Sequence, residues 1–235
     1  MAKTAYLCAT SANELLNMAY FPKYIFIDFD GTLADTLEVL KIAYYEFLKE
    51  MGFRGSDIEF KDLNGPPLSE IISFLSNKYS IRLQREILEE KYLGIITSLI
   101  GEADLNLGSQ ELLSFAAENN LGVGIVTSNY KHVVEAWLKS KKIFNYISFI
   151  ISSEDVMLGK PNPEPYLRAI EVSGVETNQI IAIEDSKNGV TSALQAGLRV
   201  FHCSNLDQDL DLTGVKKVKS LYDIISTLTK NQKTF

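Results

Sequence analysis

From about residue 107 onward, the sequence alternates between short apolar runs and longer stretches with helical periodicity. This alternation is typical of a parallel β-sheet whose strands are joined by crossover helices. Strands are predicted at four positions, 121–127, 146–152, 180–183 and 199–203. Helices are predicted around them, over 109–119, 131–140, 164–173, 188–196 and 219–229. The chain is therefore expected to contain a doubly wound, Rossmann-like α/β fold.

A segment without convincing strands, residues 36–102, precedes this region. Apolar residues recur there at helical spacing, so three helices are expected, over about 37–48, 68–75 and 88–99. Asp35 and Glu38 are predicted to form a capping box at the start of the first helix.

The whole chain is therefore predicted to have two parts. Residues 1–35 and 103–235 are expected to form the Rossmann-like core, and residues 36–102 an all-helical cap inserted into it. The hinges between core and cap are expected near Ala34 and within 101–106. A length of 235 residues accommodates one domain that carries such an insertion.

Composition limits the classes of partner and compartment. The 30 acidic and 23 basic residues give a formal charge of −7, which argues against nucleic acid as a partner. Two distant cysteines, Cys8 and Cys203, favour a reducing compartment, so the cytoplasm is expected. No apolar run is long enough to span a membrane, and residues 1–20, with one helix predicted at 11–18, do not resemble a signal peptide.

Two carboxylates stand at the end of an apolar strand that begins at residue 24. Side chains at i and i+2 of a strand share a face, so Asp28 and Asp30 can reach one site. Two close carboxylates repel each other, and a divalent cation would relieve that repulsion. One could attack as a nucleophile while the other, which keeps its proton longer, acts as general acid and base. The alternative is ordinary turn chemistry, since Gly31 follows and Asp and Gly are common turn residues.

Polar residues also follow the later strands. Ligands of open parallel sheets bind beyond the carboxyl ends of the strands, so these residues can meet Asp28 and Asp30. They are, in chain order, Thr127, Ser128, Asn129, Lys160, Glu184, Asp185 and Ser186. Each alone is explained by a helix cap or a solvated turn lysine. Together they suit phosphoryl transfer, because a dianionic phosphate needs positive charge, hydroxyl and N–H donors, and a metal.

With these residues, the chain resembles the haloacid dehalogenase superfamily of phosphohydrolases. All four motifs of that family are matched in order across nearly the whole core: Asp28-Phe29-Asp30-Gly31-Thr32, Thr127 at a strand end, Lys160 in Gly-Lys-Pro-Asn-Pro-Glu-Pro-Tyr, and Glu184-Asp185-Ser186. Each motif alone is weak, but four in order are specific. Residues 36–102 look like the helical cap of the branch that includes phosphoglycolate phosphatases, β-phosphoglucomutases and pyrophosphatases, in which the cap closes over small substrates.

The resemblance implies a catalytic role for both aspartates. Asp28 would attack phosphorus and form an aspartyl-phosphate. Asp30 would protonate the leaving oxygen and then deprotonate the hydrolytic water, which requires a raised pKa. Thr127 and the backbone N–H groups near Phe29 and Ser128 would bind the phosphate oxygens.

A magnesium site is also implied by the resemblance. Mg²⁺ would be held by the carboxylates of Asp28 and Asp185 and by the main-chain carbonyl of Asp30. Glu184 would contribute through water. Lys160 would balance the remaining negative charge at the site.

The activity expected from the resemblance is Mg²⁺-dependent hydrolysis of a small phosphorylated metabolite, such as phosphoglycolate or a sugar phosphate. Dehalogenating members lack the second aspartate, which is present here as Asp30, so phosphate ester hydrolysis fits better. β-Phosphoglucomutases carry a histidine twelve residues beyond the nucleophile, where this chain has Leu40, so a phosphosugar mutase is the second hypothesis. A catalytically silent binding protein is the third.

Substrate identity depends on the cap in this architecture. The loop 64–67 is the first candidate, so Gly65 is predicted to face the substrate, with a helix connector as the alternative. Asn129 is predicted to bridge the core and the bound ligand, and Asp35 and Thr36 to cap a helix. Packing or surface roles are assigned to Tyr24, His132, Trp137 and His202. The sequence does not indicate an oligomeric state.

Overall fold

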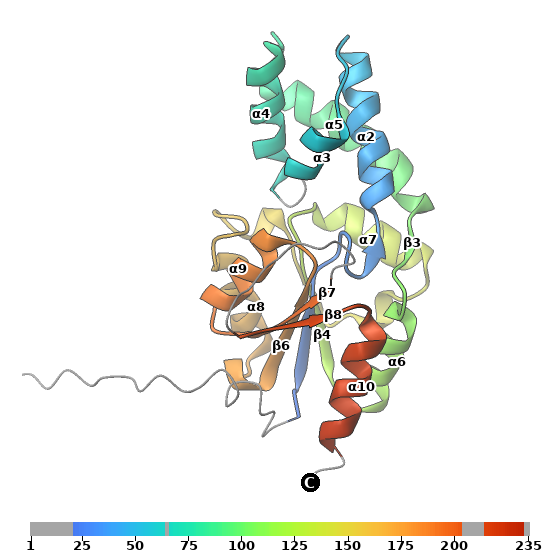
Figure 1. Cartoon of the computed structure of the whole chain (residues 1–235), viewed down its shortest axis with the longest axis vertical. Helices are drawn as coiled ribbons and strands as arrows, with labels where there is room; N and C mark the ends of the chain where they lie inside the picture. Colours follow the sequence, from blue (N-terminus) through green and yellow to red (C-terminus); the bar gives the residue numbers. More distant parts are fainter. Residues whose placement is uncertain (1–20, 64–65, 204–213, 233–235) are drawn as a thin grey trace, which may run out of the picture.

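The computed structural model describes residues 21–63, 66–203 and 214–232, which form an α/β core with a group of helices above it (Figure 1). The predicted fold class is confirmed, because a parallel sheet is covered by helices on both faces and carries an inserted helical cap. The helix predicted at 11–18 lies outside the described residues. No helix in the described ranges is long and apolar enough to cross a membrane.

Six parallel strands, in the order β5-β4-β1-β6-β7-β8, make up the core sheet. Their bounds are Tyr24–Ile27 (β1), Gly122–Val126 (β4), Phe149–Ile151 (β5), Ile180–Glu184 (β6), Arg199–Cys203 (β7) and Val215–Val218 (β8). β1 lies between β4 and β6, and its last residue, Ile27, pairs with Ile125 and Ile183. The chain moves first to one side of β1 and later to the other. The carboxyl end of β1 is therefore the switch point at which such sheets bind ligands.

Alternate side chains of β1 belong to two apolar clusters, one on each face of the sheet. Ile25 and Ile27 pack in a cluster with residues of α6, α7 and α10. Phe26 packs in a cluster with residues of α8 and α9. The bounds of these helices are Ser109–Glu118 (α6), Lys131–Ser140 (α7), Glu164–Ser173 (α8), Lys187–Gln195 (α9) and Leu221–Gln232 (α10). Because both faces are covered, the central strands read as nearly continuous apolar runs.

The described residues of the cap form four helices that pack around an apolar cluster of their own. Their bounds are Leu37–Glu50 (α2), Asp57–Asp62 (α3), Leu68–Tyr79 (α4) and Arg85–Leu99 (α5). Phe47 of α2 stacks on Tyr92 of α5, with ring centroids 4.8 Å apart. The chain enters and leaves the cap through two short antiparallel strands, β2 (Ala34–Asp35) and β3 (Asp104–Leu105). This ribbon lies where the hinges are predicted, and the domain bounds of 36–102 stay a prediction.

Several local predictions differ from the structure. The capping box at Asp35 and Glu38 is wrong, because the N-cap of α2 is Thr36 and its side chain caps no N–H of the helix. The strand predicted at 146–152 is shorter, since Phe144–Tyr146 forms a 3₁₀ turn before β5. The sequence analysis missed α3 and β8. The strand β8 reads Val-Lys-Lys-Val, and lysines on an edge strand obscure its apolar pattern.

Candidate active site

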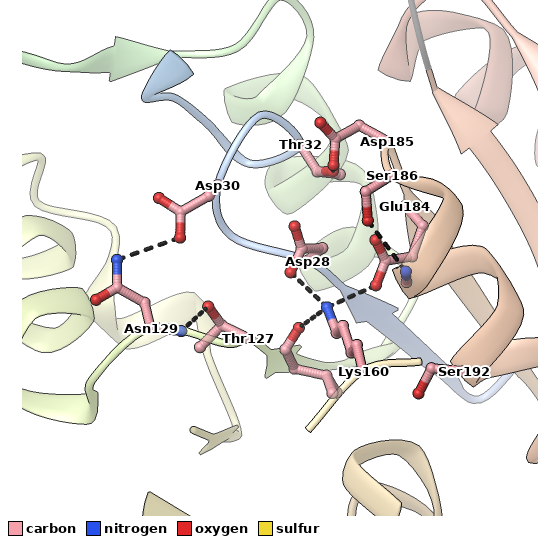
Figure 2. Close-up of polar contacts among 12 residues, drawn as sticks. Asp28, Asp30, Thr32, Thr127, Asn129, Lys160, Glu184, Asp185, Ser186 and Ser192 are labelled. Carbon is pink, nitrogen blue, oxygen red and sulfur yellow. Dashed lines mark hydrogen bonds and ion pairs between the residues drawn. The ribbon is translucent and has the colours of Figure 1, made fainter. Parts of the chain in front are cut away.

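A buried lysine joins two carboxylates at the carboxyl end of the sheet (Figure 2). The Nζ atom of Lys160 lies 2.6 Å from Oδ1 of Asp28 and 2.6 Å from Oε1 of Glu184, and it donates to the carbonyl of Val126 at 2.8 Å. Lys160 is only 4% exposed, so the alternative of a solvated turn lysine is wrong. Burial opposes its positive charge, but Asp28 and Glu184 outweigh that cost and raise the pKa of Lys160 above its ordinary value.

Three carboxylates share this position. One oxygen each from Asp28, Glu184 and Asp185 lies within 4.8 Å of the others. Burial, with Asp28 and then Glu184 adding to it, raises the pKa of Asp185 well above its usual range, although Thr32 donates a hydrogen bond to it at 3.3 Å. Burial also raises the pKa of Glu184 to about 7. Oxygen ligands of this kind suit a hard divalent cation, which would relieve their mutual repulsion.

Glu184 is fully buried and is held by a tyrosine that the sequence analysis did not single out. The hydroxyl of Tyr166 donates to Oε1 of Glu184 at 2.5 Å, the same oxygen that contacts Lys160. The other oxygen, Oε2, has no hydrogen-bond partner within the described part of the chain. Tyr166 ends the Gly-Lys-Pro-Asn-Pro-Glu-Pro-Tyr tract, so its place in that motif was the available signal.

The first turn of α9 lies directly behind Glu184. The side chain of Ser186 accepts the N–H of Gly189 at 3.0 Å, so the interpretation of Ser186 as a helix cap is confirmed. A Cβ atom at Gly189 would overlap the carboxylate of Glu184. Glycine at this position therefore allows the helix to approach the carboxylate.

Asp30 lies on the side of the site that faces away from Lys160 (Figure 2). Its Oδ2 accepts a hydrogen bond from Nδ2 of Asn129 at 3.2 Å, whereas its buried Oδ1 has no partner among the described residues. Burial first, and the charge of Asp28 second, raise the pKa of Asp30 to about 6, and the hydrogen bond from Asn129 reduces this shift. The raised pKa expected for Asp30 is thus found.

The residues after β4 form a compact turn beside Asp30. The hydroxyl oxygen of Thr127 accepts the N–H of Asn129 at 3.0 Å, so its own hydrogen can be donated to a ligand. Oδ1 of Asn129 accepts the N–H of Tyr130 at 2.8 Å. The N-cap of α7 is Tyr130, so the alternative interpretation of Ser128 or Asn129 as that N-cap is wrong.

The turn after β1 is held by the residues that directly follow β2 and β3. Gly31 has a φ of +77°, and a side chain there would overlap Asp185. Its N–H donates to the hydroxyl of Thr36 at 3.2 Å, and its carbonyl accepts from Nδ2 of Asn106 at 2.6 Å. Thr36 therefore supports the turn rather than capping α2 with its side chain. Asn106 was missed because only the fold brings it next to this turn.

His202 also supports the site from behind. It is 2% exposed on β7, and its Nε2 lies 3.0 Å from the main-chain carbonyl of Asp185. The register of the sheet places His202 beside Glu184 on β6. The sequence analysis expected only a packing or surface role for His202. The contact with Asp185 was not predicted, because it depends on the pairing of β6 with β7, which the sequence does not reveal.

A cavity of about 90 Å³ lies between the core and the cap. Its core side includes Asp28, Asp30, Ser128, Asn129 and Lys160. Its cap side consists of residues from α2, α3, α4, α5 and the segment before α4. Gly65, the predicted specificity residue, lies outside the described residues. The structure therefore brings the other site candidates to one cavity or to its immediate support, while their individual roles stay predictions.

Comparison with known proteins gives an independent assignment. A family model described as haloacid dehalogenase-like hydrolase matches residues 24–203. Pyrophosphatase PpaX of Oceanobacillus iheyensis is 26% identical over 178 residues, which cover 74% of this chain and 80% of that protein. The phosphorylated carbohydrates phosphatase of Thermotoga maritima is 26% identical over 213 residues, which cover 87% of this chain and 97% of that protein.

A solved structure gives the same fold. CbbY from Rhodobacter sphaeroides, in complex with phosphate, superimposes with a TM-score of 0.80 at 22% identity, covering 88% of this chain and 99% of that one. The family match runs from β1 through the cap to β7, so it includes every residue of the cluster around Lys160. The chain belongs to the haloacid dehalogenase-like hydrolases.

Proposed function

We propose that this protein is a Mg²⁺-dependent phosphatase that hydrolyses a small phosphate monoester through an aspartyl-phosphate. One observation carries the proposal: Asp28, held by Lys160, lines the same cavity as Asp30, which has a raised pKa and an oxygen without a partner in the described ranges. The first can act as nucleophile and the second as proton donor. The named phosphatases among the relatives support this reading.

The first half-reaction transfers the phosphoryl group to Asp28. A carboxylate oxygen of Asp28 forms a bond to phosphorus as the ester P–O bond breaks. Asp30 donates its proton to the departing oxygen, so the alcohol leaves neutral. Lys160 stays charged beside Asp28, and the hydroxyl of Thr127 can donate to a phosphoryl oxygen.

The second half-reaction releases phosphate. Asp30, now a carboxylate, takes a proton from a water molecule as that water attacks phosphorus. The bond between phosphorus and Asp28 breaks, and both aspartates return to their starting forms. The 3.2 Å hydrogen bond from Asn129 holds one oxygen of Asp30, so the other remains available for both proton transfers.

Magnesium is the proposed cofactor. Asp28 and Asp185 would bind it directly with the main-chain carbonyl of Asp30, and Glu184 through water. When bound, it supplies positive charge that stabilises the charge developing on the phosphoryl oxygens. The donor set fits, because three clustered carboxylates have one lysine as their close cationic partner within the described residues.

The test compares wild-type protein with Asp28→Asn on p-nitrophenyl phosphate and on a panel of phosphorylated metabolites, with and without Mg²⁺. We expect phosphate release that requires Mg²⁺ and falls to background in the variant. Asp104→Asn is the matched control, because its carboxylate is 91% exposed and should leave turnover unchanged. Undiminished turnover by Asp28→Asn would refute the nucleophile.

The two other hypotheses are tested in the same assay. A mutase would convert a sugar phosphate into an isomer without net phosphate release. A silent binding protein would release no phosphate and would not bind beryllofluoride, an aspartyl-phosphate analogue, at Asp28. Leu40 lines the cavity and offers it no polar atom, so the geometry favours hydrolysis. We retain the cytoplasm as the proposed compartment, consistent with the free thiol of Cys203.

A further inference from the structure

The cavity between the core and the cap has two chemically different walls. The core wall carries charged and polar side chains, as described above. The described part of the cap wall is formed by nine residues, each apolar or aromatic: Leu40, Phe60, Leu63, Pro66, Leu68, Ile71, Tyr92, Leu93 and Ile96. No charged or amide side chain from the described cap residues reaches this cavity.

The two walls contact different parts of a substrate. Phosphorus must lie near Asp28 on the core wall for the proposed reaction, so the rest of the ester extends toward the cap wall. Hydroxyl groups on that part would lose water and find almost no replacement partner there. An unpaired buried hydroxyl is costly, whereas burying carbon against carbon is favourable.

One polar atom interrupts this apolar wall. Tyr92 is 4% exposed and lines the cavity, and its hydroxyl has no hydrogen-bond partner among the described residues. Its ring is fixed by stacking on Phe47, with an interplanar angle of 15°. Burial alone raises the pKa of Tyr92, so the hydroxyl stays neutral and able to donate or accept one hydrogen bond. Because Tyr92 lines the cavity, its hydroxyl is available to a polar group of a ligand there.

The size of the cavity sets a further limit. A single water molecule needs roughly 10–15 Å³ of such volume. The cavity of about 90 Å³ therefore has room for a compact group.

We infer that the substrate, if the proposed phosphatase function is correct, is the phosphate ester of a small and mainly apolar alcohol with no more than one polar group beyond the phosphate. The core wall binds the phosphate, the carbon side chains of the cap cover the alcohol, and Tyr92 accounts for the single polar group. Polyhydroxylated sugar phosphates are then poor substrates.

The experiment compares two esters that share a three-carbon chain, propyl phosphate and glycerol 3-phosphate. The readout is the ratio of their kcat/KM values, which does not depend on the fraction of active protein in a preparation. We expect at least about a tenfold preference for propyl phosphate, since an apolar pocket rejects a ligand with an added hydroxyl by up to roughly a hundredfold in kcat/KM. The hydroxyls of glycerol make it the better leaving group, so the expected preference opposes intrinsic reactivity.

Cap variants test whether the wall causes the preference. Leu40→Asn puts an amide into the cavity and should lower the ratio severalfold. Ile42→Asn is the matched control, because Ile42 lies on the same helix, is 42% exposed and does not line the cavity. Tyr92→Phe removes the one polar atom and should raise the ratio. A ratio unchanged in both Leu40→Asn and Tyr92→Phe would refute the role of the wall.

The outcomes also separate this inference from the proposed function. Hydrolysis of both esters with a ratio at or below one would overturn the substrate class and leave the phosphatase intact. Failure to hydrolyse these esters, together with no Mg²⁺-dependent release from p-nitrophenyl phosphate, would overturn both.

Discussion

At the scale of single residues, the site holds more acidic groups than basic ones. Four carboxyl groups, those of Asp28, Asp30, Glu184 and Asp185, lie in the site, and the ammonium group of Lys160 contacts two of them, Asp28 and Glu184. Burial raises the pKa of three of these carboxyl groups, because the charged forms lose water. The site is thus prepared to hold a proton on one side of Asp28 and a cation on the other.

The proton on Asp30 gives a prediction for the pH dependence of activity. Its pKa of about 6 means that the acid form is lost as the pH rises through this value, so kcat/KM for an alkyl phosphate should fall above about pH 6. p-Nitrophenyl phosphate needs no proton on its leaving group and should lack this descending limb. The two esters lose their second phosphate proton at different pH values, so each substrate is titrated separately and its ionisation is removed from the profile. Identical profiles would contradict the role of Asp30 as the acid.

Removing the hydroxyl of Tyr166 should destabilise the protein, because Oε1 of buried Glu184 would lose its 2.5 Å hydrogen bond. For Tyr166→Phe we expect the free energy of unfolding to fall by about 1–3 kcal/mol in a urea titration. Tyr222→Phe is the control, because Tyr222 makes the same kind of bond to Glu111 at an exposed position. Its expected effect is below about 0.5 kcal/mol. Equal effects of the two substitutions would rule out a special role for the buried bond.

At the scale of elements, the site depends on how closely two structures approach it, the turn after β1 and the first turn of α9. Gly31 and Gly189 permit these approaches, since a side chain at either would overlap a carboxylate. Both glycines stand beside motif residues in the sequence. The contact of Gly31 with Asp185 follows only from the pairing of β1 with β6, whereas Gly189 meets Glu184 where β6 leads into α9.

The approach of α9 can be tested with a pair of glycine substitutions in helices. Gly189→Ala should lower the free energy of unfolding by about 1–3 kcal/mol, because Glu184 or the helix must move. Gly94→Ala in α5 has open space at the same atom and should raise the free energy of unfolding by up to about 1 kcal/mol through helix propensity. Thermal or urea unfolding of both variants measures the contrast. An unchanged free energy of unfolding in Gly189→Ala would show that α9 does not pack tightly against Glu184.

Much of this element order could be predicted from the sequence, for a physical reason. Strands buried on both faces must be apolar throughout, so β1, β4 and β6 are conspicuous, and their polar ends mark the site. The edge strand β8 is not buried in this way, and its lysines hide it. Asn106, Tyr166 and His202 act through contacts across the fold, which local patterns do not encode. The apolar cap wall was likewise not predicted, because its residues come from separate helices.

At the scale of the whole molecule, the helices of the cap lie above the core (Figure 1). The cavity between them is lined by Asp28 and Asp185 of the acidic cluster. The core provides the reacting groups, and the cap provides most of the surface that a substrate would touch. A cation bound to the acidic cluster would therefore act on the stability of the folded chain as well as on catalysis.

Magnesium should stabilise the folded protein, because it binds carboxylates that are brought together only by folding. At a concentration one hundred times Kd, the gain is about 2.7 kcal/mol, which corresponds to a rise in Tm of roughly 5–11 °C. Thermal unfolding in EDTA and in Mg²⁺ measures this rise without any substrate. Asp185→Asn should reduce the rise and Asp104→Asn should preserve it. A Tm that is insensitive to Mg²⁺ in the wild-type protein would argue against the site.

The ribbon formed by β2 and β3 affects how the inserted segment can change in evolution. The two strands pair with each other, Ala34 opposite Leu105 and Asp35 opposite Asp104, so the ends of the inserted segment are neighbours. None of the six core strands comes from the segment between them. A different insert with closely spaced ends could replace the present one while the sheet keeps its pairing, so the recognition surface can be exchanged as a module without altering the reaction chemistry.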